Sequence, residues 1–167
     1  MTRFGELLRT LTSAGVDYIV VGGVAAVAHG SPRTTQDVDV VYRRGSDNLL
    51  RLAAAIAPLN PQLRGAPPGL PFHCDVPTLK AGLNFTLTTS GGALDLLGEI
   101  TGGGSYEDLL SHTTLVQVFG VSCRVLNLED LIRVKRAAGR PKDFEGIAEL
   151  EVLRETRGAV EPPRGKE

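Results

Sequence analysis

The chain has 167 residues, 42% of them hydrophobic and 22% charged, and its 18 basic and 19 acidic residues leave a formal net charge of −1. These values are those of a single soluble globular domain that needs neither a metal nor a disulfide to fold. The near-neutral balance gives no overall basic footprint for nucleic acid, although a local patch could still hold one as a substrate.

The cysteines and the N-terminus indicate where the protein works. Cys74 and Cys123 lie far apart with no CxxC spacing, which predicts neither a zinc site nor a disulfide framework. Residues 1–15 are amphipathic and lack the apolar core of a signal peptide. The most apolar stretch, residues 18–28, is shorter than the roughly 20 residues of a membrane span. We therefore expect a cytoplasmic protein with no membrane partner.

Hydrophobic periodicity and turn residues divide the first half of the chain into alternating helices and strands. The pattern predicts a helix from Phe4 to just before Gly15, a strand at 16–21, a short helix at 24–29, a strand at 35–42 and a helix at 47–57. Residues 58–71 are rich in proline and glycine and have no periodicity. We expect them to form a long loop that is mobile or contacts the substrate.

The second half of the chain predicts two hairpins and three helices. They are strands at 83–88 and 93–97, a short helix at 106–110, strands at 116–118 and 121–126, a helix at 128–138 ended by Gly139, and a helix from Pro141 to about Arg154. This order favours an α+β domain with a mixed sheet flanked by helices over a doubly wound parallel one. We expect one domain over residues 1–157 and a disordered tail over residues 158–167.

Residues 33–39 are the part of the sequence richest in chemically active side chains. Alternate side chains of a strand share one face, so Asp37 and Asp39 are expected side by side, about 6 to 7 Å apart. The same alternation adds Arg33 and Thr35 to that face. Paired carboxylates are suitable ligands for two Mg²⁺ ions in phosphoryl transfer. A solvated strand face with two acids is the alternative explanation.

The glycine pair Gly22-Gly23 separates a predicted buried strand from a predicted short helix. Such a pair lets a phosphate approach backbone N–H groups at a helix N-terminus. A tight turn without a ligand is the alternative. The segment contains neither the GxGxxG of a dinucleotide site nor the GK[ST] of a P-loop.

These residues together resemble a known family. Their order along the chain is Gly22, Gly23, Gly30, Arg33, Thr35, Asp37 and Asp39. It resembles the signature of the nucleotidyltransferase superfamily with the DNA-polymerase-β-like fold, especially the small bacterial branch related to abortive-infection and toxin nucleotidyltransferases. The resemblance implies a nucleotidyltransferase-like mixed sheet with an α-β-α-β-α-β core. Many relatives carry serine where Gly23 stands, which leaves only backbone contacts to phosphate here.

The resemblance extends to two later segments. The third carboxylate of such enzymes lies on the next core strand, and Asp95, between apolar neighbours at 93–97, matches it. A strand-edge acid near a turn is the alternative for Asp95. The segment 128–143 resembles the family's helix–turn–helix ending and implies that Lys135 contacts phosphate. Arg140 and Asp143 are secondary candidates or a structural pair.

The resemblance implies a Mg²⁺-dependent nucleotidyltransferase that moves an NMP from an NTP, such as ATP, to an acceptor hydroxyl with release of pyrophosphate. Two Mg²⁺ ions and the catalysis would be assigned to Asp37, Asp39 and Asp95. The nucleotide would be bound by Gly22, Gly23, Arg33, Thr35 and Lys135.

The sequence does not determine which acceptor receives the nucleotide or which partners the protein binds. A small molecule such as an aminoglycoside antibiotic, a tRNA and a protein are all candidates, and the low overall charge disfavours tRNA. We expect the 58–71 loop, the last helices or a second subunit to bind the acceptor. The alternative function is a non-catalytic nucleotide- or partner-binding module of a toxin–antitoxin or other defence system, with a homodimer or an antitoxin-like partner.

Overall fold

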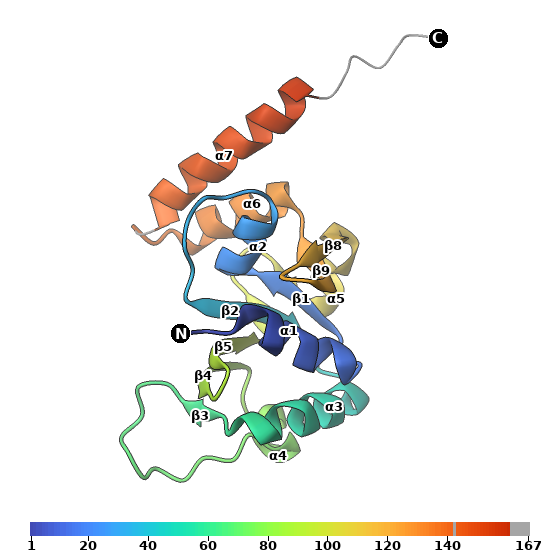
Figure 1. Ribbon diagram of the computed structural model, residues 1–167, viewed down its shortest axis with the longest axis vertical. Helices are drawn as coiled ribbons and strands as arrows, with labels where there is room; N and C mark the ends of the chain where they lie inside the picture. The colour runs from blue at the N-terminus through green and yellow to red at the C-terminus, as the bar shows by residue number, and fades with distance from the viewer. Residues whose placement is uncertain (142, 161–167) are drawn as a thin grey trace.

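A seven-stranded mixed sheet organises the protein, and the computed structural model describes residues 1–141 and 143–160 of it (Figure 1). Its strands are β1 (Tyr18–Val21), β2 (Asp37–Tyr42), β3 (Gln62–Leu63), β4 (Asn84–Thr89), β5 (Gly92–Leu97), β8 (Thr113–Val118) and β9 (Val121–Leu126). They lie in the order β3-β4-β5-β2-β1-β9-β8. A separate two-stranded sheet is formed by β6 (Glu99–Ile100) and β7 (Gly104–Ser105).

The helices cover this sheet and extend from it. They are α1 (Phe4–Ser13), α2 (Gly22–Ala28), α3 (Ser46–Ile56), α4 (Val76–Ala81), α5 (Tyr106–Leu109), α6 (Leu128–Ala138) and α7 (Asp143–Val160), with short 3-10 turns at Ala57–Leu59 and Leu110–His112. In Figure 1, α7 projects beyond one end of the sheet, whereas α3 and α4 lie at the other end. Within the described residues, no helix is both long and apolar enough to cross a lipid bilayer.

The pairing of the central strands makes the sheet mixed. β2 is antiparallel to β1 and parallel to β5, while β1 is parallel to β9. All four residues of β1 are buried, so both faces of the sheet are covered at its centre. On α1, the side chains of Leu7, Leu8 and Leu11 recur at helical spacing and are at most 1% exposed. The prediction of an α+β fold with a mixed sheet flanked by helices is confirmed.

Among the boundaries that differ from the sequence prediction, three bear on the site or on the expected tail. The strand predicted at 35–42 begins only at Asp37, because β1 ends at Val21 opposite Asp39 and residues before Asp37 have no partner strand. The short helix starts at Gly22 instead of Val24. The last helix continues to Val160, so residues 158–160 of the expected tail are helical, and residues 161–167 lie outside the described residues.

Candidate active site

Three carboxylates converge where β2 and β5 lie side by side. Asp39 is paired with Asp95 across the two parallel strands, and Asp37 lies two residues before Asp39 on the same face. Oxygen atoms of these three side chains all lie within 4.8 Å of one another. The alternating residues, such as Val38 and Leu94, are fully buried on the other face. The structure therefore brings the three predicted acids, the acid cluster, together.

Burial and mutual repulsion change the ionisation of the acid cluster. The pKa of Asp39 is raised to about 7, first by burial, then by a hydrogen bond with Asp95 and by the negative charges of Asp95 and Asp37. A carboxyl group with this pKa is partly protonated near neutral pH. A divalent cation between the three carboxylates would offset the repulsion among them, which adds to the effect of burial.

One cation already lies at the acid cluster, and it comes from the loop predicted at 58–71. Arg64 follows β3, and its Nη2 donates to Asp95 Oδ1 at 2.8 Å and to the carbonyl oxygen of Leu87 at 2.6 Å. Its Nη1 lies 3.7 Å from Asp37 Oδ2. The sequence analysis did not identify Arg64 as a site residue. One signal was present: Arg64 is the only Lys, Arg, Asp or Glu between Arg51 and Asp75.

The glycine pair Gly22-Gly23 packs closely against β2 and against the segment that precedes it. Gly22 has φ +64°, and a Cβ there would overlap the carboxylate of Asp39. A Cβ on Gly23 would overlap the side chain of Thr35. Both glycines thus allow the start of α2 to approach these side chains closely. The close packing therefore explains why both positions are glycine, and it places the backbone of Gly22 beside Asp39.

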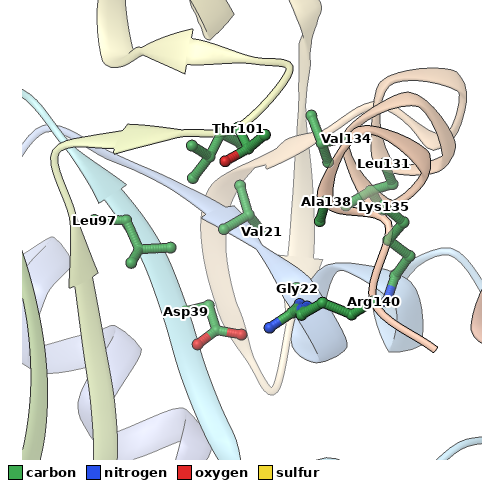
Figure 2. Close-up of a pocket in the computed structure, with 11 residues that line it drawn as sticks. Val21, Gly22, Asp39, Leu97, Thr101, Leu131, Val134, Lys135, Ala138 and Arg140 are labelled. Carbon is green, nitrogen blue, oxygen red and sulfur yellow. The ribbon is translucent and has the colours of Figure 1, made fainter. Parts of the chain in front are cut away.

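A cavity of about 360 Å³ opens beside Asp39 (Figure 2). Its walls are mainly apolar side chains, contributed by Val21, Leu97, Ile100, Leu131, Val134 and Ala138. Lys135 and Arg140 enter from the α6 side, and Asp39 lies across from them. Within the described part of the chain, Lys135 forms no ion pair with a carboxylate. An apolar cavity with an acid at one side and a free ammonium group at the other suits an anionic ligand with an apolar body.

The other predicted nucleotide contacts lie farther along the same side of the molecule. Gly23, Arg33, Thr35 and Lys135 line a second, smaller cavity of about 100 Å³. The guanidinium of Arg33, however, pairs with Glu149 at 2.7 Å and Glu145 at 3.0 Å, both on α7. Arg33 is therefore not directed at the acid cluster, because residues 31–36 are not in the strand that would have aligned it with Asp37.

Arg140 and Asp143 form a pair with each other. Arg140 Nε donates to Asp143 Oδ2 at 2.8 Å, and the Asp143 carboxylate is buried at the start of α7. This contact joins Arg140, just beyond the end of α6, to the first residue of α7. It supports the structural interpretation of Asp143, while Arg140 also reaches the cavity wall.

The donor set of the acid cluster fits a hard divalent cation. Three carboxylates supply oxygen ligands without sulfur or nitrogen, which is the chemistry that Mg²⁺ and Mn²⁺ accept. The pKa of Asp39 is raised by burial first and then by its two acidic neighbours, while Arg64 acts in the opposite direction. Asp37, Asp39 and Asp95 are thus the residues that would hold a metal.

Several solved structures have a fold similar to that of this chain. Neither a protein-family description nor a curated protein sequence matches the chain. The crystal structure of ANT(2″)-Ia in complex with adenylyl-2″-tobramycin is similar over 95% of this chain and 91% of that chain, with a TM-score of 0.60 and 14% identity. The solution structure of the antibiotic-resistance factor ANT(2″)-Ia is similar over 93% and 89%, with a TM-score of 0.54 and 15% identity.

A third similar structure comes from Paracoccidioides brasiliensis. It is an antigenic nucleotidyltransferase-like protein, which covers 89% of this chain and 73% of its own, with a TM-score of 0.52 and 20% identity. At these identities the similarity establishes the fold alone. The chain has the mixed-sheet fold of nucleotidyltransferases, as the sequence resemblance implied.

Proposed function

We propose that the protein is a Mg²⁺-dependent nucleotidyltransferase that transfers an NMP from an NTP to an acceptor hydroxyl. The observation that carries the proposal is the convergence of Asp37, Asp39 and Asp95 within 4.8 Å, on a fold shared with nucleotidyltransferases. A solvated strand face does not account for this arrangement, because the third acid comes from a different strand and one of the three has a strongly raised pKa.

The nucleotide is proposed to lie in the cavity beside Asp39. Lys135 offers an ammonium group without an acidic partner in the described residues, so we assign it the main contact with the triphosphate. Backbone N–H groups at Gly22 and Gly23 are proposed to contact the same phosphates. Thr35 and Arg33 stay secondary predictions, and Arg33 would first have to leave Glu145 and Glu149.

The chemistry follows from the positions of the acids. Bound Mg²⁺ supplies charge stabilisation for the transferring phosphoryl group. Asp37, Asp39 and Asp95 would hold the cation, and Asp95 would also accept the proton of the acceptor hydroxyl. The hydroxyl oxygen forms a bond to the α-phosphorus as the bond between that phosphorus and the bridging oxygen breaks, and pyrophosphate leaves. The protein contributes positioning and electrostatics and forms no covalent intermediate.

The proposal is tested by nucleotidyl transfer. Each labelled NTP is incubated with Mg²⁺ and with three acceptor pools: aminoglycosides, tRNA and small molecules from cell extract. We expect labelled product and pyrophosphate from the wild-type protein and from Glu107→Ala, which removes an exposed acid on α5. Asp37→Ala/Asp39→Ala should lose at least about 10³-fold in rate, because the metal ligands are gone. Transfer that survives this double substitution would contradict the assignment.

The similar structure bound to adenylyl-2″-tobramycin supports the aminoglycoside pool as the first to examine. NTP binding that requires Mg²⁺ but yields no transfer to any pool would instead favour a non-catalytic nucleotide-binding module. The toxin-type branch, an antitoxin-like partner or homodimer, and a cytoplasmic location stay predictions of the sequence.

A further inference from the structure

Arg64 lies in a defined row of residues across the sheet. β4 pairs with β5 so that Thr86 is opposite Asp95, and β5 pairs with β2 so that Asp95 is opposite Asp39. The backbone N–H of Arg64 donates to the carbonyl oxygen of Thr86 at 2.9 Å. Arg64 therefore extends the row by one strand, and its side chain reaches over Thr86 to the acid cluster.

The position of the guanidinium is fixed by the backbone as well as by charge. Nη2 is held by the Leu87 carbonyl oxygen and the Asp95 carboxylate together, at 2.6 and 2.8 Å. Nε is buried without a hydrogen-bond partner in residues 1–141 and 143–160. The Arg64 side chain is 30% exposed and that of Asp95 is 18% exposed, so this is a partly desolvated contact and not a mobile surface pair.

We propose that Arg64 is a positioning residue with two effects on the acid cluster. It orients the Asp95 carboxylate, and its guanidinium is a cation already at the site, whose positive charge repels a divalent ion that binds there. The inference rests on the proposed metal site of the acid cluster. One oxygen of Asp95 is already used by Arg64 Nη2, and a full positive charge stays within a few ångström of any ion held by Asp37 and Asp39. The free protein thus binds a divalent cation weakly.

The direction in which the affinity for a divalent cation changes when Arg64 is replaced distinguishes this charge effect from the effect of a residue that only orients a metal ligand. A residue that merely orients a metal ligand strengthens metal binding, and its removal lowers affinity by about 10- to 100-fold. A cation already at the site does the opposite: its removal raises affinity. At an effective dielectric constant of about 20, loss of one charge at this distance is enough for a gain of about tenfold or more.

The experiment is a titration of the nucleotide-free protein with Mn²⁺, followed by electron paramagnetic resonance. We expect Arg64→Gln to bind Mn²⁺ about tenfold more tightly than the wild type. Arg64→Lys keeps the charge and should stay within about threefold of the wild type. Arg51→Gln removes an arginine paired with Asp47 and Asp17, outside the acid cluster, and should leave the affinity unchanged. Adding Asp37→Ala/Asp39→Ala to Arg64→Gln should abolish the tight site.

Unchanged or weaker Mn²⁺ binding by Arg64→Gln overturns the proposal, and so does an equal gain in Arg64→Lys. Thermal unfolding of each variant verifies that it is folded. The titration needs no nucleotide and no turnover, so its outcome is separate from that of the transfer assay. A protein that binds Mn²⁺ as expected but transfers no nucleotide would contradict the proposed function and leave the role of Arg64 supported.

Discussion

The carboxyl group of Asp39 makes the stability of the metal-free protein depend on pH. In the folded protein its pKa is about 7, whereas an aspartate in an unfolded chain titrates near 4. Between these values the folded state holds more protons than the unfolded state. The free energy of unfolding therefore contains a contribution that is present at low pH and is lost as pH rises from about 4 to about 7.

Asparagine is uncharged at every pH, so Asp39→Asn avoids the loss of stability that ionisation of Asp39 causes as pH rises to about 7. We expect Asp39→Asn to be more stable than the wild type at pH 8 by roughly 2 kcal/mol, after allowance for solvent around the half-buried group, and the difference to shrink toward pH 5. The measurement is urea unfolding at several pH values with a chelator present. Glu107→Gln, at an exposed acid, should follow the wild type. A constant difference between Asp39→Asn and wild type across this range would contradict the argument.

The helix α7 is held to the rest of the protein by its buried apolar residues more than by its exposed ion pairs with Arg33. Leu150 is 1% exposed and Ile147 is 8% exposed, whereas Val152 on the same helix is 59% exposed. The pairs from Arg33 to Glu145 and Glu149 are largely solvent-exposed and contribute little.

We therefore predict that Leu150→Ala lowers the free energy of unfolding by about 2 to 4 kcal/mol, and that Val152→Ala changes it by less than about 0.5 kcal/mol. Arg33→Gln should cost no more than about 1 kcal/mol. Urea unfolding monitored by circular dichroism measures all three. An effect of Arg33→Gln larger than that of Leu150→Ala would show that the ion pairs, and not the apolar contacts, hold α7.

The strands show where alternation along the sequence correctly predicts which side chains share one face of the sheet, and where it does not. In β4 apolar and polar residues alternate, and in β5 the buried Leu94 and Leu96 flank Asp95, so the predicted hairpin agrees with the structure. The same rule, applied to residues 33–35, placed Arg33 beside the acids. It did not hold there because those residues have no partner strand.

Arg64, β3 and α4 could not be predicted in the same way. β3 has two residues and α4 has six, which is too short for either periodicity to be visible. α4 does carry a local signal, since the Asp75 carboxylate accepts from the N–H of Thr78 at its first turn. The position of Arg64 depends on the pairing of β3 with β4, which brings together residues more than 20 apart in the chain.

Across the whole molecule, the net charge of −1 conceals a separation of opposite charges. The acid cluster lies where β2 and β5 pair, and Lys135 and Arg140 lie across the cavity from Asp39. A cation that binds the folded state and not the unfolded state stabilises the entire fold by mass action.

Addition of Mn²⁺ at about 100 times its dissociation constant is therefore expected to raise the free energy of unfolding by about 2.7 kcal/mol. For a chain of this size, the thermal midpoint should rise by roughly 5 to 10 °C. Differential scanning calorimetry measures the change, and a chelator should reverse it. The same rise in Asp37→Ala/Asp39→Ala would mean that the cation acts elsewhere.

The two cysteines provide intrinsic reporters of local opening. Cys74 lies in the segment before α4 and Cys123 in β9, and both are buried, at 9% and 4% exposure. Burial also raises the pKa of each thiol, to about 11 for Cys74, so little reactive thiolate forms at neutral pH. A thiol reagent consequently reacts mainly with molecules in which one of these regions has opened. The rates at the two positions follow, without any introduced label, how often the α4 end of the fold and the β8–β9 hairpin separate from the core.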